Sequence, residues 1–263
     1  RKEVLVSRGE LIEIGGSFRL PDIMKSANCK LREVGTTNRT NLEDYEDAIR
    51  ANTALIFKAY SSNFTMNGYT KTVDEIDLIN LCKKRNLPLI IDLGSGTLID
   101  LERAGLKFGP NPNKKIKMGV DLVTFSGDKL MGGPQCGIIT GRLDLIKKIK
   151  KNPMKRALRC DKFTISALSE LLRLYQNPEE AIQKIPTLRF LSRSREEIKS
   201  LAERVLPSVQ NCLANVAIVK IINCNSQVGS GTLPNESIPS VGISIEKISK
   251  QKNRLFPIKL AKI

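Results

Sequence analysis

Short apolar runs alternate with amphipathic segments over the first half of the chain. Five runs have the length and composition of buried strands, and they are Glu3–Ser7, Lys30–Val34, Thr53–Ala59, Leu87–Leu93 and Val120–Phe125. Apolar residues at helical spacing lie between them, most clearly from Val73 to Arg85, and Asn41 is a suitable N-cap for a helix over Leu42–Ala51. Strands and helices in alternation predict an α/β fold with a mostly parallel sheet covered by helices.

The pattern becomes mainly helical after a further strand at Gly137–Thr140. We expect helices at Leu145–Lys151, Lys162–Tyr175 and Ile185–Val205, followed by strands at Ala217–Ile222 and Val241–Ile245. The helix that begins at Ile185 is expected to bridge two domains. The predicted domains are a large one over residues 1–184 and a smaller C-terminal α/β domain, with its bridging helix, over residues 185–263.

Composition narrows the classes of function that remain. The 263 residues are 41% hydrophobic and 27% charged, which is typical of a soluble globular protein. Histidine is absent, which excludes imidazole as a general base or metal ligand. The six cysteines have no C-x-x-C or zinc-like spacing, so we expect reduced thiols and no metal site. With no apolar run of membrane-spanning length and no signal peptide, the sequence predicts a cytoplasmic protein without a membrane partner.

The net charge of +16 is concentrated in one part of the chain. Nine basic residues lie between Arg142 and Lys162, where Asp144 and Asp161 are the only acidic residues. Such a block attracts polyanions such as nucleic acid, because each neutralised phosphate adds to affinity. A solvated helix face that keeps the protein soluble is an equally good interpretation at this point.

A lysine in a glycine-rich turn is the first candidate for chemistry. Lys129 follows the apolar run Val120–Phe125, with glycines on both sides of it in Ser126-Gly-Asp-Lys-Leu-Met-Gly-Gly-Pro-Gln135. This placement suits an amine that forms a Schiff base with a bound aldehyde, and the hydroxyl of Ser126 is suited to hold a phosphate. The alternative is a β-turn with an exposed lysine.

An aspartate at the end of a buried strand is the second candidate. Asp92 ends the apolar run of Leu89-Ile-Ile-Asp92, at the strand end where open α/β sheets bind ligands. A carboxylate there can pair with a protonated pyridine nitrogen, although it can equally cap the following turn. Asp92 lies thirty-seven residues before Lys129, a spacing common among pyridoxal-phosphate enzymes of the aminotransferase type.

Four segments together resemble the bacterial selenocysteine synthase family, the L-seryl-tRNA(Sec) selenium transferases. The segments are Val6–Arg19, Arg32–Thr40, Asp92–Gly96 and Ser126–Gln135. Lys155–Lys162 and Ser226–Pro234 are also similar to that family, and the resemblance extends from about residue 3 to about residue 242. It implies pyridoxal-phosphate fold type I, the aspartate-aminotransferase-like fold.

The resemblance also implies roles for the residues of the two motifs. Lys129 is expected to bind pyridoxal 5'-phosphate covalently, Asp92 to face the pyridine nitrogen, and Ser126 to contact the phosphate. Thr36 and Thr37 follow a strand, and they either line the cofactor cleft or form a simple polar turn.

Two arginines match family positions that handle the selenium donor, selenophosphate. Arg156 and Arg159 are three residues apart, a spacing that places both guanidinium groups on one face of a helix. Such a pair is well suited to bind a phosphate. The alternative is a surface pair in a basic helix.

The implied reaction converts seryl-tRNA(Sec) to selenocysteinyl-tRNA(Sec) through an aminoacrylyl intermediate on the cofactor, in a homo-oligomer of dimers or larger rings. The chain lacks the family's N-terminal tRNA-binding domain and its glycine-rich phosphate loop, and it departs from the family after about residue 245, so we expect it to be truncated at both ends. Two alternatives remain open. One is a related pyridoxal-phosphate enzyme acting on a small amino acid, and the other is an inactive truncated remnant.

Overall fold

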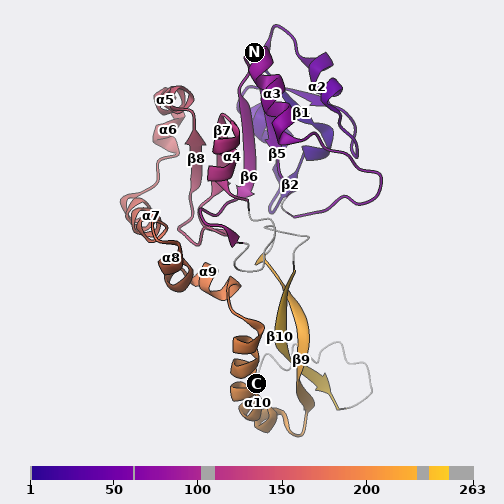
Figure 1. The fold of residues 1–263 in the computed structure, drawn as a ribbon, viewed down its shortest axis with the longest axis vertical. Helices are drawn as coiled ribbons and strands as arrows, with labels where there is room; N and C mark the ends of the chain where they lie inside the picture. The colour runs from indigo at the N-terminus through magenta and orange to yellow at the C-terminus, as the bar shows by residue number, and fades with distance from the viewer. Residues whose placement is uncertain (1, 62, 102–109, 230–236, 249–263) are drawn as a thin grey trace. The chain divides into compact units, whose positions relative to one another are not determined.

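The computed structural model describes residues 2–61, 63–101, 110–229 and 237–248 (Figure 1). The chain forms two compact units, Arg1–Ser192 with Val228–Glu236, and Arg193–Gln227 with Ser237–Ile263. The sequence places its domain boundary between residues 184 and 185, a few residues before the change of unit. Part of the family-like segment 226–234 lies outside the described residues.

A six-stranded sheet forms the centre of the first unit, in the order β4-β1-β5-β6-β7-β8. The first five strands of this order are parallel, and β8 pairs with β7 in the antiparallel direction. The strands are β1 (Glu3–Ser7), β4 (Lys30–Val34), β5 (Thr53–Ala59), β6 (Leu89–Ser95), β7 (Leu122–Ser126) and β8 (Gly137–Gly141). The mostly parallel α/β sheet expected from the sequence is therefore present.

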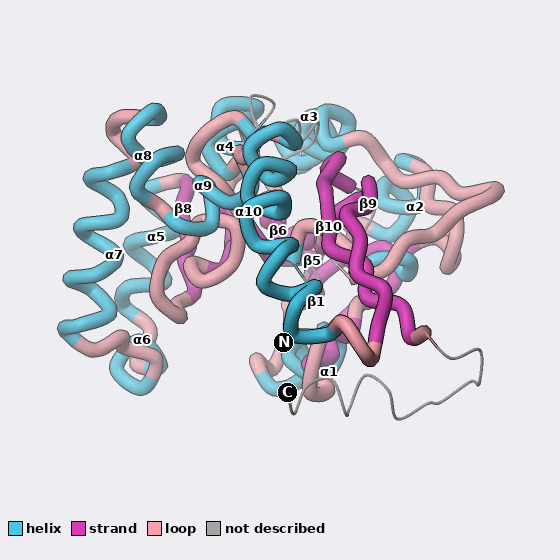
Figure 2. Tube along the Cα trace, turned by 90° about the horizontal axis from the view of Figure 1, so that it is seen from below, coloured by secondary structure: helices cyan, strands magenta, loops and turns pink. Residues whose placement is uncertain are grey.

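Helices cover both faces of this sheet. The crossover from β1 to β4 runs in one direction along the sheet, and the later crossovers run in the other. Crossovers between parallel strands are right-handed, so the direction of a crossover decides which face its helix covers. The helix between β1 and β4 therefore lies on one face of the sheet, and the helices of the later crossovers lie on the opposite face. Figure 2 shows this arrangement, with α1 on one side of the strands and α3 and α4 on the other. The helices are α1 (Leu20–Ser26), α2 (Leu42–Ala48), α3 (Glu75–Arg85) and α4 (Pro112–Met118).

The register of the strands assigns side chains to these two faces. Val4, Val6 and Ala59 form a core with Leu20 and Met24 of α1, so they point to the α1 face. The neighbouring positions along the strands point to the face covered by α3 and α4.

Side-chain caps explain where several helices begin. Asp74 accepts a hydrogen bond from the backbone N–H of Ile76 at the start of α3, and Asn111 accepts two at the start of α4. Asn41 and Asp44 form a capping box that starts α2. The first unit also contains η1 (Arg8–Glu10), β2 (Glu13–Ile14), β3 (Phe18–Arg19), α5 (Leu143–Lys151), α6 (Met154–Ala157), α7 (Lys162–Leu174), α8 (Pro178–Lys184) and α9 (Pro186–Leu191).

In its described residues, the second unit contains one helix packed on a pair of strands. Its elements are α10 (Arg195–Leu213), β9 (Ala217–Gln227) and β10 (Ser237–Lys247), and the two strands are antiparallel. The prediction of a single helix over Ile185–Val205 is wrong. The structure has α9 and α10 there, because Ser194 and Glu197 form a capping box that starts a new helix. None of the described helices is long and apolar enough to cross a membrane.

Candidate functional site

Asp92 lies at the carboxyl end of β6, on the α1 face of the sheet. Its register partners are Ala59 on β5 and Thr124 on β7. The Asp92 Oδ1 atom accepts a hydrogen bond of 2.8 Å from the hydroxyl of Thr124 and one of 3.1 Å from the backbone N–H of Gly94. Within the described residues, the Oδ2 atom accepts none, and the side chain is only half-buried. The carboxylate is therefore held through one oxygen, and the other oxygen is free for a donor.

A bulge in β6 shapes the chain directly after this aspartate. The register with β7 shifts between Asp92 and Ser95, so that Ser95 lies opposite Ser126. Gly94 occupies the extra position with a φ of +62°, a left-handed conformation that favours glycine. The hydrogen bond from Gly94 N–H to the Asp92 carboxylate closes a turn that holds the side chain in place.

Lys129 follows β7 in a turn that joins β7 to β8. The turn is closed by a hydrogen bond from Gly127 N–H to the Cys136 carbonyl, 2.9 Å, and by one from Gly133 N–H to the Gly127 carbonyl, 2.7 Å. The backbone N–H of Leu130 also donates to the Ser95 hydroxyl, 3.3 Å, which ties the turn to the end of β6. Lys129 is half-buried, in keeping with a lysine presented at the edge of the sheet.

The segment from α7 to α9 supports the lysine turn from behind. The hydroxyl of Tyr175 donates a hydrogen bond of 2.8 Å to the carbonyl of Met131, and both residues are buried. A Cβ added at Gly132 would lie 2.7 Å from a methyl carbon of Ile185, and one added at Gly133 would lie 2.6 Å from Leu171. The glycines after Lys129 are thus required for this close packing, as well as for the turn itself.

The structure brings three of the predicted residues to one edge of the sheet. Asp92 and Ser126 lie at the carboxyl ends of the neighbouring parallel strands β6 and β7, and Lys129 lies three residues beyond Ser126. This is the edge at which open parallel sheets bind ligands. Ser126 is half-buried, and within the described residues its hydroxyl makes no hydrogen bond.

Thr36 and Thr37 lie elsewhere along the same edge. They follow β4, which is separated from β6 by β1 and β5, so roughly 14 Å of sheet lies between them and the line of Asp92. Both are exposed, and the Thr36 hydroxyl donates to the Arg39 carbonyl at 2.9 Å. This geometry is that of a local polar turn.

Arg156 and Arg159 were expected on one face of a helix, and the structure does not place them so. Arg156 is in α6, which ends at Ala157, and Arg159 lies in the loop after that helix. The helix is short because its C-cap, Leu158, leaves the helical conformation with a ψ of 11°. Both arginines are exposed and, in the described part of the chain, neither forms an ion pair.

Figure 1 shows α5 and α6 beside the arrowhead of β8. The strand ends there at Gly141, opposite Leu122 at the start of β7, so this is the far end of the strands from the Lys129 turn. The structure does not bring the arginines to Asp92 and Lys129 within one chain.

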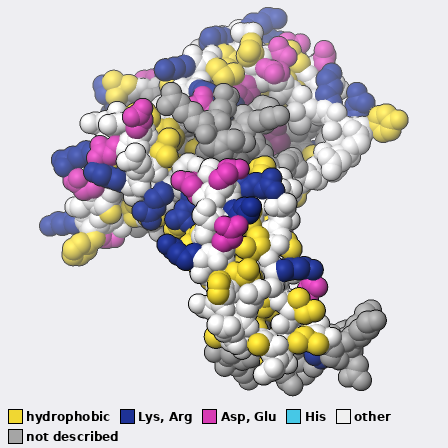
Figure 3. All heavy atoms as spheres, turned by 60° about the horizontal axis from the view of Figure 1, so that its bottom comes forward, with side chains coloured by type: hydrophobic (Ala, Val, Ile, Leu, Met, Phe, Trp, Pro, Cys, Tyr) yellow, Lys and Arg dark blue, Asp and Glu magenta, His cyan; other side chains and the backbone are white. Residues whose placement is uncertain are grey.

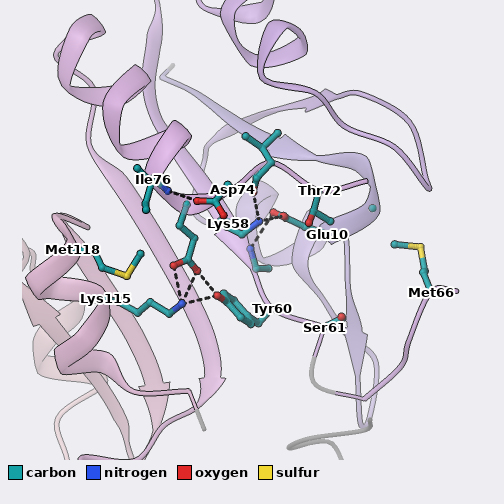
Figure 4. A pocket seen from close by; sticks show the side chains of 14 residues that line it. Glu10, Lys58, Tyr60, Ser61, Met66, Thr72, Asp74, Ile76, Lys115 and Met118 are labelled. Carbon is teal, nitrogen blue, oxygen red and sulfur yellow. Dashed lines mark hydrogen bonds and ion pairs between the residues drawn. The ribbon is translucent and has the colours of Figure 1, made fainter. Parts of the chain in front are cut away.

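A cavity of about 460 Å³ opens on the other side of β5. Lys58 is the register partner of Ile91, so it points to the face opposite Asp92. Its Nζ atom lies 2.8 Å from Glu10 Oε1, and both side chains are nearly buried (Figure 4). Burial raises the pKa of the Glu10 carboxyl, and the charge of Lys58 partly offsets that rise.

A second polar cluster lines the same cavity. Lys115 Nζ binds both carboxylate oxygens of Glu75, at 2.8 and 2.7 Å, and the hydroxyl of Tyr60 at 2.8 Å (Figure 4). Tyr60 also donates to the Glu75 carboxylate. Since the charged groups of both clusters satisfy one another, we interpret them as structural links between β5, α3 and α4.

Sequence reasoning missed three residues that position the site. Thr124 orients Asp92, Ser95 holds the lysine turn, and Tyr175 supports that turn. A polar residue two positions before the end of β7 was a usable signal for Thr124, because it shares a face with the strand-end Ser126. Tyr175 had no such signal, since its partner is a backbone carbonyl 44 residues away.

Solved structures identify the class of fold. The chain is similar to D-glucosaminate-6-phosphate ammonia-lyase, with a TM-score of 0.64 and 19% identity over 93% of this chain and 55% of that one. A double mutant of Thermus thermophilus aspartate aminotransferase is similar with a TM-score of 0.50 and 16% identity, over 84% of this chain and 55% of that one. The fold is therefore the aspartate-aminotransferase-like fold, type I of the pyridoxal-phosphate enzymes, as the sequence predicted.

Sequence comparison then identifies the family. The family model described as "SelA: L-seryl-tRNA selenium transferase" matches residues 1–260, and the chain belongs to that family. It is 50% identical over 254 residues to the L-seryl-tRNA(Sec) selenium transferase of Klebsiella pneumoniae (strain 342), which covers 97% of this chain and 55% of that protein. For the protein of the same name from Proteus mirabilis (strain HI4320), the identity is 52% over 92% of this chain and 52% of that protein. The chain spans about half the length of the curated relatives it matches.

Proposed function

We propose that this chain forms the catalytic part of a pyridoxal-phosphate-dependent L-seryl-tRNA(Sec) selenium transferase. Its substrates are seryl-tRNA(Sec) and selenophosphate, and its product is selenocysteinyl-tRNA(Sec). The observation that carries the proposal is the placement of Asp92, Ser126 and Lys129 on adjacent parallel strand ends, in a chain of this family.

The residues present fit pyridoxal phosphate. Asp92 offers a carboxylate oxygen that no described residue uses, and Thr124 fixes the orientation of the group through its other oxygen. This arrangement suits a protonated ring nitrogen. Ser126 offers a free hydroxyl for the phosphate, and Lys129 offers the amine that binds the aldehyde. When bound, the cofactor supplies an electron sink that weakens bonds at the substrate Cα atom.

The chain's own residues supply the proton transfers and the rigidity. Exchange of the seryl β-hydroxyl for selenium requires that a proton leave the seryl Cα atom and that one return. Lys129 Nζ is assigned as the base and acid for that proton, because Lys129 lies in the turn that follows β7, at the edge of the sheet where Asp92 and Ser126 lie. The hydrogen bonds of Gly127, Leu130 and Tyr175 hold the turn, and so limit the positions that the amine can occupy.

The selenium donor, selenophosphate, is expected to bind to Arg156 and Arg159. Both guanidinium groups are exposed and unpaired in the described residues, which leaves them available for a phosphate. Because they lie at the far end of β8 from the Lys129 turn, a second protomer must present them to the site. We therefore include a dimer-based homo-oligomer in the proposal.

The two alternative functions have less support. The chain is about 50% identical to named selenium transferases over nearly its whole length. This similarity argues against an inactive remnant and against an enzyme with a different substrate. An enzyme acting on a small amino acid would accept free serine in place of seryl-tRNA.

Transfer of radiolabelled selenium tests the proposal. Protein containing this chain is incubated with pyridoxal phosphate, selenophosphate and either seryl-tRNA(Sec) or free serine. We expect transfer to seryl-tRNA(Sec) alone, its loss in Lys129→Ala and a large decrease in Asp92→Asn, with Lys84→Ala on α3 as an unaffected surface control. Transfer to free serine at a similar rate, or undiminished transfer in Lys129→Ala, would contradict it.

A further inference from the structure

The outer face of α5 carries an unpaired cluster of lysines. Lys147, Lys148 and Lys151 are exposed and, in the described part of the chain, none of them forms an ion pair. Some lysines on other helices do pair, as Lys184 does with Glu180 at 2.5 Å in α8. Repulsion among the α5 lysines is thus not offset by an ion pair with any residue that the structure describes.

The amphipathic character of α5 fixes the direction of these side chains. Leu145 and Ile146 are half-buried, and they lie on the side of the helix that meets β8. At 100° per residue, Lys147, Lys148 and Lys151 point away from that side. Lys147 and Lys151 are one turn apart, so their charges follow the helix at a separation of roughly 6 Å.

The two acidic residues of the segment Arg142–Lys162 are already engaged. Asp144 accepts two hydrogen bonds from Arg142, at 2.9 and 2.7 Å, and this pairing lowers the pKa of its carboxyl to about 2. Asp161 caps the start of α7 through the backbone N–H groups of Phe163 and Thr164. The segment Arg142–Lys162 therefore has nine cations against two occupied anions, an excess of seven in a chain of net charge +16.

We propose that the α5 lysine face, Lys147, Lys148 and Lys151, binds the phosphate backbone of the tRNA substrate. The inference rests on the proposed function, and it adds a docking surface to the reaction site. Lys and Arg side chains are spread over the side of the first unit where α5 to α8 lie, seen on the left of Figure 3. Three lysines dominate the outer face of α5, and Leu143 at the start of the helix is the exposed apolar side chain beside them, so the chemistry of this face matches a polyanion better than an apolar protein surface.

Binding of an uncharged tRNA(Sec) transcript at several salt concentrations tests this surface. The protein is compared with the triple variant Lys147→Ala, Lys148→Ala and Lys151→Ala. Loss of about three phosphate contacts is expected to weaken binding by on the order of 30- to 100-fold at low salt, and to reduce the slope of log K against log salt by about 2–3. Alanine has a higher helix propensity than lysine, so α5 is expected to remain folded.

A second triple variant separates a local effect from one of net charge. Lys83, Lys84 and Arg85 are exposed on α3, and their replacement by alanine removes the same charge elsewhere on the unit. We expect this control to bind the transcript within about twofold of the unmodified protein. An equal loss in both triple variants, no loss in the α5 variant, or no tRNA binding by the unmodified protein would each overturn the proposal.

Absorbance of bound pyridoxal phosphate keeps this result separate from that of the proposed function. The α5 variant is expected to retain the cofactor band in full, because its changes are far from Lys129. Absence of the band in the unmodified protein would contradict the proposed function, whatever the outcome for tRNA.

Discussion

Replacement of Tyr175 by phenylalanine removes one hydroxyl from the support of the lysine turn. Tyr175 is 9% exposed, and its hydroxyl donates to the carbonyl of Met131, which is fully buried, at 2.8 Å. Burial raises the pKa of Tyr175 to about 12, with a hydrogen bond to Thr97 partly offsetting that rise. The phenol therefore remains protonated, and remains a donor, throughout the neutral range.

The expected loss follows from the burial of both partners. Phenylalanine keeps the ring packing, but the Met131 carbonyl is left without a donor in a site that water does not reach. An unsatisfied buried acceptor costs about 1–3 kcal/mol, so we expect the free energy of unfolding to fall by ~2 kcal/mol, a change of about 30-fold in the unfolding equilibrium. Affinity for pyridoxal phosphate should fall as well, since the turn that carries Lys129 is held less firmly.

Urea unfolding and cofactor titration measure the two effects. Tyr69→Phe is a matched control, because Tyr69 is 90% exposed, and its change should stay within about 0.5 kcal/mol. The reasoning is refuted if Tyr175→Phe unfolds at the same urea concentration as the unmodified protein, with an unchanged dependence on urea. A stability loss without any change in cofactor affinity would show that the turn does not depend on this support.

Three further predictions concern other residues of the chain. Gly132→Ala should lower the free energy of unfolding by more than about 2 kcal/mol in urea unfolding, because its φ is +71° and an added Cβ would lie 2.7 Å from a buried side chain. Lys58→Met should cost about 3–5 kcal/mol at neutral pH by leaving Glu10 buried and unpaired. Burial already raises the pKa of Glu10 above 4.5, and the variant loses the charge of Lys58 that partly offsets this rise. The free energy of unfolding of the variant should therefore fall as pH rises through the pKa of Glu10 in the folded protein. In acid, where Glu10 is protonated, the variant should lose less stability relative to the unmodified protein. Burial raises the pKa of the Cys82 thiol to about 12, so iodoacetamide at pH 8 should alkylate exposed Cys212 well before Cys82, as peptide mass spectrometry would show.

The sequence was sufficient for the parallel strands because their apolar runs are long and bounded by turn residues. Thr53–Ala59 was predicted with the bounds that β5 has in the structure. Asp92 and Lys129 were found because each follows such a run, and strand order then places the two ends side by side. Their roles toward the cofactor stay predictions until the cofactor is bound.

Features that depend on distant contacts or on helix ends were not predictable in this way. The helix around Arg156 ends early, and the break before α10 depends on the Ser194 capping box rather than on apolar spacing. The bulge after Asp92 depends on register with β7, which no local pattern records. Gly94 was visible in the sequence, but its left-handed φ was not.

Covalent attachment of the cofactor to Lys129 is the central claim, and one measurement tests it directly. Protein containing this chain is incubated with pyridoxal phosphate, reduced with borohydride and digested, and the peptides are examined by mass spectrometry. The account predicts a pyridoxyl-phosphate adduct on Lys129 and the absence of that adduct in Lys129→Ala. An adduct on another lysine with Lys129 unmodified, or no adduct despite saturating cofactor, would contradict it.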